Sequence, residues 1–168
     1  MLRGAARALA ERADVVTAIA RTTSHLDRLR EDAAPRRVET VALDWADSAR
    51  LREAVVGAAG TRGPFDLAVA WLHSSAREAA PVLASALAET SPACRLFLVV
   101  GSRDDAEQPV KRAWHERLSA AAGLVYRRVR LGRRDGPPRR WLTDDEISRG
   151  VLDAVLGDLE DALVGDSW

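Results

Sequence analysis

Residues 2–21 read LRGAARALAERADVVTAIAR and place a helix directly before a strand. Small and apolar side chains recur at helical spacing over 2–13, which predicts a helix there. Residues 15–20 are apolar and partly β-branched, which predicts a strand that ends at Arg21. This order is the second half of a β-turn-α-β unit. We therefore expect the strand and most of the glycine turn that begin such a unit to be missing.

The rest of the chain continues the alternation of helices and strands. Two helices are predicted to open with capping boxes, at 24–27 (SHLD) and 143–146 (TDDE). The segments 66–72 and 96–101 are apolar on both faces, as strands of a covered parallel sheet are. The predicted strands are 15–20, 38–43, 66–72, 96–101, 124–131 and 161–165. Such alternation predicts one α/β domain over 1–168, a Rossmann-like three-layer sandwich with a mostly parallel sheet and its first strand missing.

Composition restricts the classes of partner and compartment. The 25 basic and 25 acidic residues cancel, which disfavours nucleic acid and anionic membranes as partners. The N-terminal segment mixes Arg and Glu with Ala and Leu, unlike a signal peptide or a membrane span. Cys94 is the only cysteine, so no disulfide can form within the chain, and we expect a cytoplasmic location. No Cys/His cluster has the spacing of metal ligands.

Several segments, in this order, resemble the short-chain dehydrogenase/reductase superfamily over nearly the whole chain. Residues 66–71 (DLAVAW) are similar to its fourth strand and the turn that touches the cofactor. Residues 95–102 (RLFLVVGS) resemble its fifth strand, which usually ends in an active-site serine, and 127–132 (RRVRLG) its sixth strand and the following glycine. Residues 70–74 (AWLHS) and 140–148 (RWLTDDEIS) resemble an atypical bacterial branch. The resemblance implies a NAD(P)-dependent oxidoreductase that acts on a small carbonyl or alcohol.

The superfamily's Tyr-x-x-x-Lys pair, in which the tyrosine exchanges a proton with the substrate, is absent. The only tyrosine, Tyr126, has this spacing to Arg130, but in a strand two such positions lie about 13 Å apart. The remaining catalytic candidates are Ser102, which ends the fifth-strand segment, and His73, which follows the strand at 66–72. A structural histidine and a serine that merely starts a loop are the alternatives.

The ends of the strands also indicate residues that hold a cofactor. Arg21 ends a strand at the position where an arginine accommodates a ribose 2′-phosphate, so NADP is favoured over NAD. Thr22 and Ser24 add hydroxyl groups at a helix start, where amides attract anions. Asp44 stands where the superfamily often has an acid near the adenine, although it could equally cap the next helix. Gly4 would be the last glycine of the turn, packed where helix and strand approach closely. The complete predicted set is Gly4, Arg21, Thr22, Ser24, Asp44, Ala70, Trp71 and Gly132.

Three functions remain open from the sequence. The chain is an oxidoreductase for a small molecule, a non-catalytic NAD(P)-binding sensor, or a truncated fragment that binds no cofactor. Superfamily members often pair, but the oligomeric state is not determined by the sequence. In the usual strand order 3-2-1-4-5-6 the missing strand is the central one. We therefore expect the strands at 15–20 and 66–72 either to face a gap of about 9.6 Å or to pair directly. Trp141 is expected to anchor the last helix to the sheet, with covering of a nicotinamide as the alternative.

Overall fold

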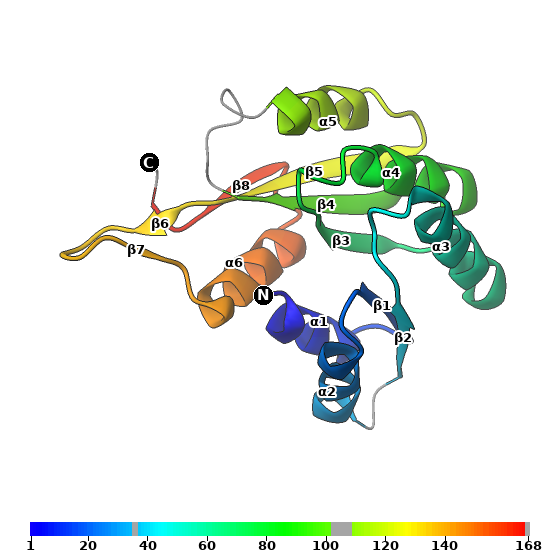
Figure 1. The fold of residues 1–168 in the computed structure, drawn as a ribbon, viewed down its shortest axis with the longest axis horizontal. Helices are drawn as coiled ribbons and strands as arrows, with labels where there is room; N and C mark the ends of the chain where they lie inside the picture. Colours follow the sequence, from blue (N-terminus) through cyan, green and yellow to red (C-terminus); the bar gives the residue numbers. More distant parts are fainter. Residues whose placement is uncertain (35–36, 102–108, 167–168) are drawn as a thin grey trace.

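The computed structural model describes residues 1–34, 37–101 and 109–166 (Figure 1). The helices are α1 (Arg3–Ala10), α2 (Thr23–Ala33), α3 (Ser48–Arg62), α4 (Ala79–Thr90), α5 (Pro109–Ser119) and α6 (Asp144–Leu156). The main strands are β1 (Val16–Ala20), β2 (Val38–Ala42), β3 (Leu67–Trp71), β4 (Cys94–Val100), β5 (Leu124–Leu131) and β8 (Asp161–Val164). A short hairpin is formed by β6 (Arg133–Arg134) and β7 (Arg140–Trp141). The predicted α/β alternation is confirmed.

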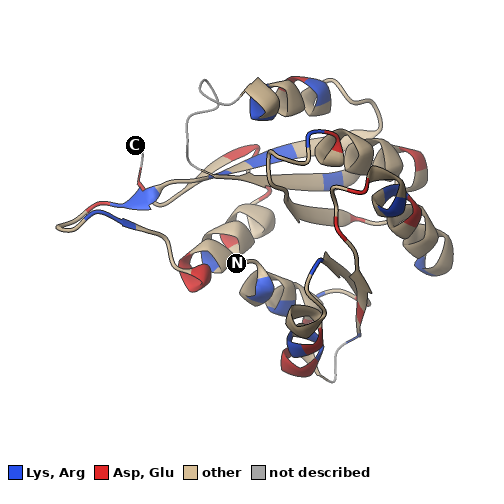
Figure 2. Ribbon diagram, viewed as in Figure 1, with Lys and Arg blue, Asp and Glu red and all other residues tan. Residues whose placement is uncertain are grey.

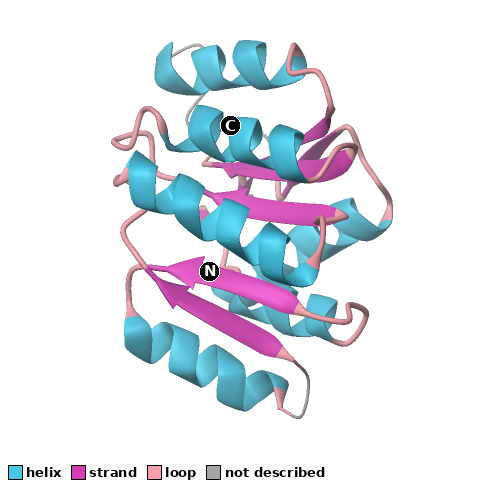
Figure 3. Ribbon diagram, turned by 90° about the vertical axis from the view of Figure 1, so that its right-hand side faces the viewer, coloured by secondary structure: helices cyan, strands magenta, loops and turns pink. Residues whose placement is uncertain are grey.

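The long strands form two parallel sheets instead of one. β3, β4, β5 and β8 are hydrogen-bonded in that order, while β1 and β2 form a separate parallel pair. Figure 3 shows the two sheets set apart, with their strands running in the same direction. Within the described residues, β1 and β3 are therefore not paired. The predicted break at the central position of the strand order is confirmed, and direct pairing of the flanking strands does not occur.

Helices on both faces connect the two sheets through continuous cores. On one face α3, α4 and α5 cover the sheets, and Ile19 of β1 packs into the same core as Leu51 of α3 and Leu98 of β4. On the other face Ala5 of α1 shares a core with Val151 of α6 and residues of β4 and β5. A third, smaller core joins α1 and α2 to the β1–β2 pair. The three layers thus extend across the break in the sheet.

Of the two predicted capping boxes, one is present and one is not. Thr143 caps α6, with its hydroxyl accepting from Glu146 N–H and the Glu146 carboxylate accepting from Thr143 N–H, so the capping box predicted at 143–146 is confirmed. The capping box predicted at 24–27 is wrong. The N-cap of α2 is Thr22, two residues before Ser24, and it has extended backbone and makes no side-chain cap bond. Ser24 is therefore the second residue of the helix.

Helix α1 is attached to the start of α6. The Ser148 hydroxyl donates to the Met1 carbonyl oxygen at 2.8 Å, and the Met1 amino group lies 3.3 Å from an Asp144 oxygen. A methyl group added to Gly4 would meet Ser148 atoms at 3.0 Å. The close packing expected at Gly4 therefore exists, but it joins two helices and not a helix and a strand. A small residue is needed here because the helices approach so closely.

Charged residues of both signs are interspersed along the chain (Figure 2). The arginines of β5 are paired within the molecule: Arg127 with Asp158, and Arg128 and Arg130 with Asp161. In the described ranges no helix is long and apolar enough to cross a membrane. The same residues contain no group of three or more His, Cys, Asp and Glu placed to hold a metal ion.

Candidate functional site

The carboxyl ends of the parallel strands form the edge at which open α/β sheets bind ligands. Four predicted residues lie within two positions of a strand end: Arg21 after β1, Asp44 after β2, His73 after β3 and Gly132 after β5. Since parallel strands end at the same edge, these residues lie along one side of the molecule. Ala70 and Trp71 are the last two residues of β3.

Arg21 and Asp44 are brought close by the pairing of β1 with β2. The Leu43 N–H donates to the Ala20 carbonyl oxygen at 3.1 Å, so the two strand ends are adjacent. The Arg21 guanidinium carbon lies 4.7 Å from the centre of the Trp45 ring, a cation–π contact. Within the described part of the chain Arg21 forms no ion pair. Its charge is therefore held in place without being neutralised by a carboxylate there.

The backbone around Asp44 decides whether Asp44 caps the next helix. An Asp44 carboxylate oxygen accepts from Ala46 N–H at 3.0 Å and closes a tight turn. The N-cap of α3 is Asp47, whose carboxylate accepts from Arg50 N–H at 3.1 Å. The interpretation of Asp44 as a helix cap is therefore wrong. Thr22 and Ser24 are exposed beside Arg21, and their predicted contact with a cofactor stays a prediction.

A second cluster lies where β3 and β4 end, and the sequence did not single out its charged member. Lys111 of α5 is 9% exposed and is the one buried charged side chain among the described residues. Its ammonium group donates to the Gly101 carbonyl oxygen at 3.2 Å. A methyl group added to Gly101 would lie 3.7 Å from both Lys111 Nζ and the Trp71 ring. The three residues therefore converge on one point of the ligand-binding edge.

Burying an ammonium group costs free energy, so the burial of Lys111 needs an explanation. Such a group is stable in the interior only when acceptors surround it. The only available signal was that Lys111 is the sole lysine beside 24 arginines, the 25 basic residues minus one. That count alone does not show that the side chain is buried. Burial follows from the packing of α5 against the end of β4.

His73 is held by its own loop. Its ring Nδ1 accepts from Ser75 N–H at 3.3 Å and lies 3.0 Å from the Ser75 hydroxyl oxygen. Because a backbone N–H can only donate, Nδ1 acts as the acceptor and the proton of the neutral ring is on Nε2. The side chain is exposed. Its predicted catalytic role stays a prediction, and Ser102 lies outside the described residues.

Gly132 has a structural reason to be glycine. Its N–H donates to the Val164 carbonyl oxygen at 2.8 Å, and an added methyl group would lie 2.0 Å from the Asp166 carbonyl oxygen. The backbone of Asp166 lies so close to Gly132 that no side chain fits at position 132. The glycine is therefore explained by the packing of the sheet, and its contact with a cofactor is untested.

The segment after Gly132, in which the sequence predicted no strand before residue 161, contains the β6–β7 hairpin. Glu146 connects this hairpin to α6, accepting from Arg140 at 2.8 Å and from Arg134 at 3.0 Å. Arg140, the Thr143 N–H and Arg134 hold the pKa of Glu146 well below its usual range. The expected anchoring role of Trp141 is wrong, because its side chain is 59% exposed and stacks with Arg133 at 4.3 Å. Leu142 is the buried residue at this point.

Comparison with known proteins gives matches to solved structures alone. No protein-family model matches the sequence, and neither does any curated protein. A metagenomic short-chain oxidoreductase solved with NADP has a TM-score of 0.73 and 17% identity, covering 99% of this chain and 92% of its own. A short-chain dehydrogenase from Burkholderia cenocepacia, also with NADP, has a TM-score of 0.73 and 16% identity, with coverage of 98% and 91%. The fold is that of the short-chain dehydrogenase/reductases.

A third structure of this fold is an alcohol dehydrogenase from the archaeon Thermococcus sibiricus, solved with 5-hydroxy-NADP. It has a TM-score of 0.69 and 14% identity, and the match covers 95% of this chain and 89% of that one. The resemblance inferred from the sequence is thus confirmed at the level of the fold. At such low identity, the roles of individual residues do not transfer.

Within the short-chain dehydrogenase/reductase fold, the only tyrosine lies away from the ligand-binding edge. Tyr126 is the third residue of β5, nearer the amino end of that strand. Its hydroxyl lies 3.5 Å from the His115 ring nitrogen, and the two rings are 5.6 Å apart. It also belongs to a strand and not to a helix, as predicted. Tyr126 and Arg130 therefore do not form a catalytic pair at this edge.

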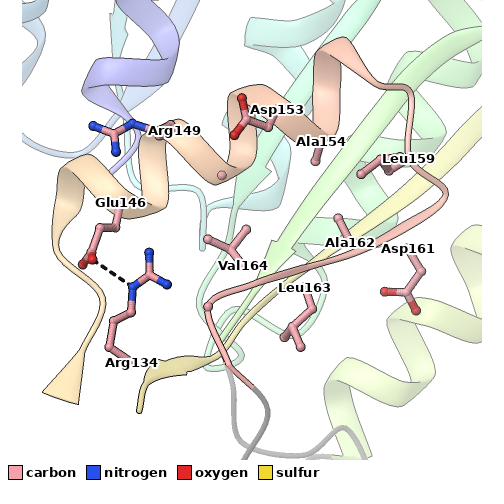
Figure 4. Close-up of a pocket in the computed structure, with 12 residues that line it drawn as sticks. Arg134, Glu146, Arg149, Asp153, Ala154, Leu159, Asp161, Ala162, Leu163 and Val164 are labelled. Carbon is pink, nitrogen blue, oxygen red and sulfur yellow. Dashed lines mark hydrogen bonds and ion pairs between the residues drawn. The ribbon is translucent and has the colours of Figure 1, made fainter. Parts of the chain in front are cut away.

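A hollow of about 400 Å³ lies between α6 and β8 (Figure 4). Arg134 and Glu146 lie at one end of it and Leu159 and Asp161 at the other. None of the predicted cofactor-binding residues lines it. This hollow is therefore distinct from the edge formed by β1 to β5, and we do not assign the cofactor to it.

Proposed function

We propose that this chain is a NADP-binding oxidoreductase that acts on a small carbonyl or alcohol. The observation that carries the proposal is the placement of two cationic side chains at the carboxyl ends of the parallel strands, one in each sheet. Arg21 stacks on Trp45 at the end of β1, and Lys111 is buried at the end of β4. A dinucleotide with a 2′-phosphate is an extended anion that binds along such an edge. The NADP complexes of two proteins with this fold support the choice of cofactor.

The adenosine end of the cofactor fits the β1–β2 edge. A guanidinium offers several N–H donors to a phosphate, and Arg21 has no competing ion pair within the described ranges. The hydroxyl groups of Thr22 and Ser24 would bind the same phosphate. Asp44, next to Trp45, would accept from the adenine amino group. These residues favour NADP over NAD.

The reactive end fits the β3–β4 edge. NADP supplies the hydride when bound, and the protein supplies orientation and charge. The Trp71 ring would form one side of the nicotinamide site. The Lys111 ammonium group would bind hydroxyl or carbonyl oxygens of the bound molecules. His73, with a proton on Nε2, is the candidate for exchanging a proton with the substrate, and Ser102 is the candidate for a hydrogen bond to the substrate carbonyl.

A non-catalytic NADP sensor is the second candidate. It is favoured by the position of Tyr126, which removes the one tyrosine from the ligand-binding edge. Such a protein would keep the contacts of Arg21 and Lys111 with the cofactor but would not transfer a hydride.

Titration with NADPH, followed by tryptophan fluorescence, tests the proposal. We expect NADPH to bind more tightly than NADH, and Arg21→Ala to weaken NADPH binding by about 10- to 100-fold, since a hydrogen bond to a charged group contributes about 1.5–3 kcal/mol. Binding of NADH should not change. Arg28→Ala, an exposed arginine on α2, is the matched control and should bind NADPH normally.

A turnover assay distinguishes the oxidoreductase from the non-catalytic sensor. Oxidation of NADPH with a panel of small aldehydes and ketones would support the oxidoreductase, whereas tight binding without turnover would support the sensor. If neither nucleotide binds, both candidates are wrong; binding that returns once an upstream strand and glycine turn are added would support the truncated fragment.

A further inference from the structure

The hollow between α6 and β8 lies beside a tight contact of these two elements (Figure 4). At Gly150 an added methyl group would lie 2.3 Å from Val164, so the helix and the strand touch there. Next to this contact the hollow is lined by Ala154 of α6 and Ala162 of β8, which are buried. Their side chains are too short to fill the space. A volume of about 400 Å³ remains, which is within the size range of small-molecule sites.

Two apolar side chains of the hollow face solvent. Leu159, between α6 and β8, is 47% exposed, and Leu163 of β8 is 43% exposed. They are two of the five large apolar side chains that are exposed among the described residues. A ligand with an apolar body would cover both leucines and the alanines beside them. Because this removes apolar surface from water, the hollow favours such a ligand.

The charged groups around the hollow have an excess of positive charge. A carboxylate lies at each end, and each is bound by two arginines: Glu146 by Arg134 and Arg140, and Asp161 by Arg128 and Arg130. Four guanidinium groups against two carboxylates leave two positive charges. The other charged residues of the lining, Arg149 and Asp153, have opposite charges, and in Figure 4 both extend away from β8. The hollow therefore suits an anion better than a cation.

Arg134 has donors available for such an anion. Its Nε donates to a Glu146 carboxylate oxygen at 3.0 Å. Over residues 1–34, 37–101 and 109–166, its two terminal amino groups have no other partner. In Figure 4 the guanidinium lies between Glu146 and Val164, at one end of the hollow. Two parallel N–H donors on one guanidinium match the two oxygens of a carboxylate.

We propose that this hollow binds a small monocarboxylate with an apolar body, of the class of the short-chain fatty acids. Its carboxylate would accept from the two terminal amino groups of Arg134, and its apolar body would lie between the two alanines and the two leucines. Glu146 already holds the guanidinium, so Arg134 loses little freedom when the ligand binds. No predicted cofactor-binding residue lines the hollow, so this ligand is additional to the proposed cofactor and substrate.

Hexanoate is the probe that tests the site, without any nucleotide present. We expect it to give saturable shifts of the NMR amide signals of Gly150, Ala162 and Leu163. Hexanamide has the same apolar body without the charge, and we expect it to bind about 10-fold more weakly or worse. Acetate has the charge without the apolar body. It should also bind at least about 10-fold more weakly, because each buried methylene contributes about a factor of 4.

Two matched substitutions locate the carboxylate. Arg134→Gln removes the proposed donors and should weaken hexanoate binding by about 10-fold or more. Arg140→Gln is the control, because Arg140 binds the same Glu146 carboxylate but does not line the hollow. Hexanoate should bind this variant normally. Equal weakening by both substitutions would show that Arg134 acts only through Glu146 and would overturn the proposal.

Three further results would contradict the site. The first is equal binding of hexanoate and hexanamide, or of hexanoate and acetate. The second is a set of amide shifts confined to the surroundings of Arg21 and Gly101, which would place the anion at the edge proposed for NADP. The third is self-association that shifts the same amides as the protein concentration rises without ligand. Because no nucleotide is used, failure here is distinct from failure of the proposed function.

Discussion

Strands β4 and β1 are made of similar residues but have different environments. β4 (CRLFLVV) lies between β3 and β5, and six of its seven residues are buried. β1 (VTAIA) pairs only with β2, and none of its five residues is buried. Both strands have helices packed on their faces. Of these two strands, the one with neighbours on both edges is the buried one, so an apolar sequence alone does not bury a strand in this molecule.

Hydrogen exchange within β3 gives the largest expected contrast. The Ala68 and Ala70 N–H groups face β4, whereas the Val69 N–H faces the other edge of β3, with which no described strand pairs. In the chain alone, we expect the two alanine amides to exchange about 1,000-fold more slowly, since they open only with most of the fold. The measurement is residue-resolved exchange by NMR. Uniformly slow exchange along β3 would show that this strand has a partner on both edges in solution.

Two matched valine substitutions compare the buried and half-buried strands. Val99 of β4 is 0% exposed, while Val69 of β3 is half-buried. We expect Val99→Ala to lower the free energy of unfolding by about 2–3 kcal/mol, through lost burial and a residual cavity. Val69→Ala should cost about 1 kcal/mol. Urea denaturation with an unchanged slope measures both, and equal costs would contradict the comparison.

The smallest expected effect is at the β6–β7 hairpin, on the other side of the four-stranded sheet. Arg140, Thr143 and Arg134 lower the pKa of Glu146, so the charged form stabilises the folded state. This contribution is present above the unfolded pKa of about 4.3 and is lost as the pH falls toward the lower, folded value. We expect Glu146→Gln to lower the melting temperature at pH 7 but to have less effect as the solution is acidified below about pH 4. An equally large effect at both pH values would show that the carboxylate charge is not involved.

The order of elements and the break in the sheet could be predicted because they depend on local patterns. Apolar runs located the strands to within a few residues, and the count of strands before 66–72 identified the missing position. The hairpin was missed because two-residue strands carry no periodicity. The start of α2 was misplaced because the backbone dihedral angles at Thr22, and not residue type alone, decide which residue caps.

The candidate site was predicted in part. Arg21 and Asp44 could be placed at the edge because each follows a strand directly in the sequence. Lys111 could not, because its burial depends on how α5 packs against β4 and Gly101, which no local pattern encodes. The exposure of Trp141 was missed for the same reason: an aromatic ring before a helix is usually buried, and here Leu142 takes that place.

The contact between α1 and α6 has a consequence for how the chain folds. Ser148 binds the Met1 carbonyl oxygen across 147 positions of sequence. Closing so long a loop is entropically costly, and contacts of such sequence separation form late in folding. During synthesis the first residues leave the ribosome long before residue 148 has been added. We therefore expect α1 and the β1–β2 pair to complete their packing only after α6 has formed, although they are synthesised before it.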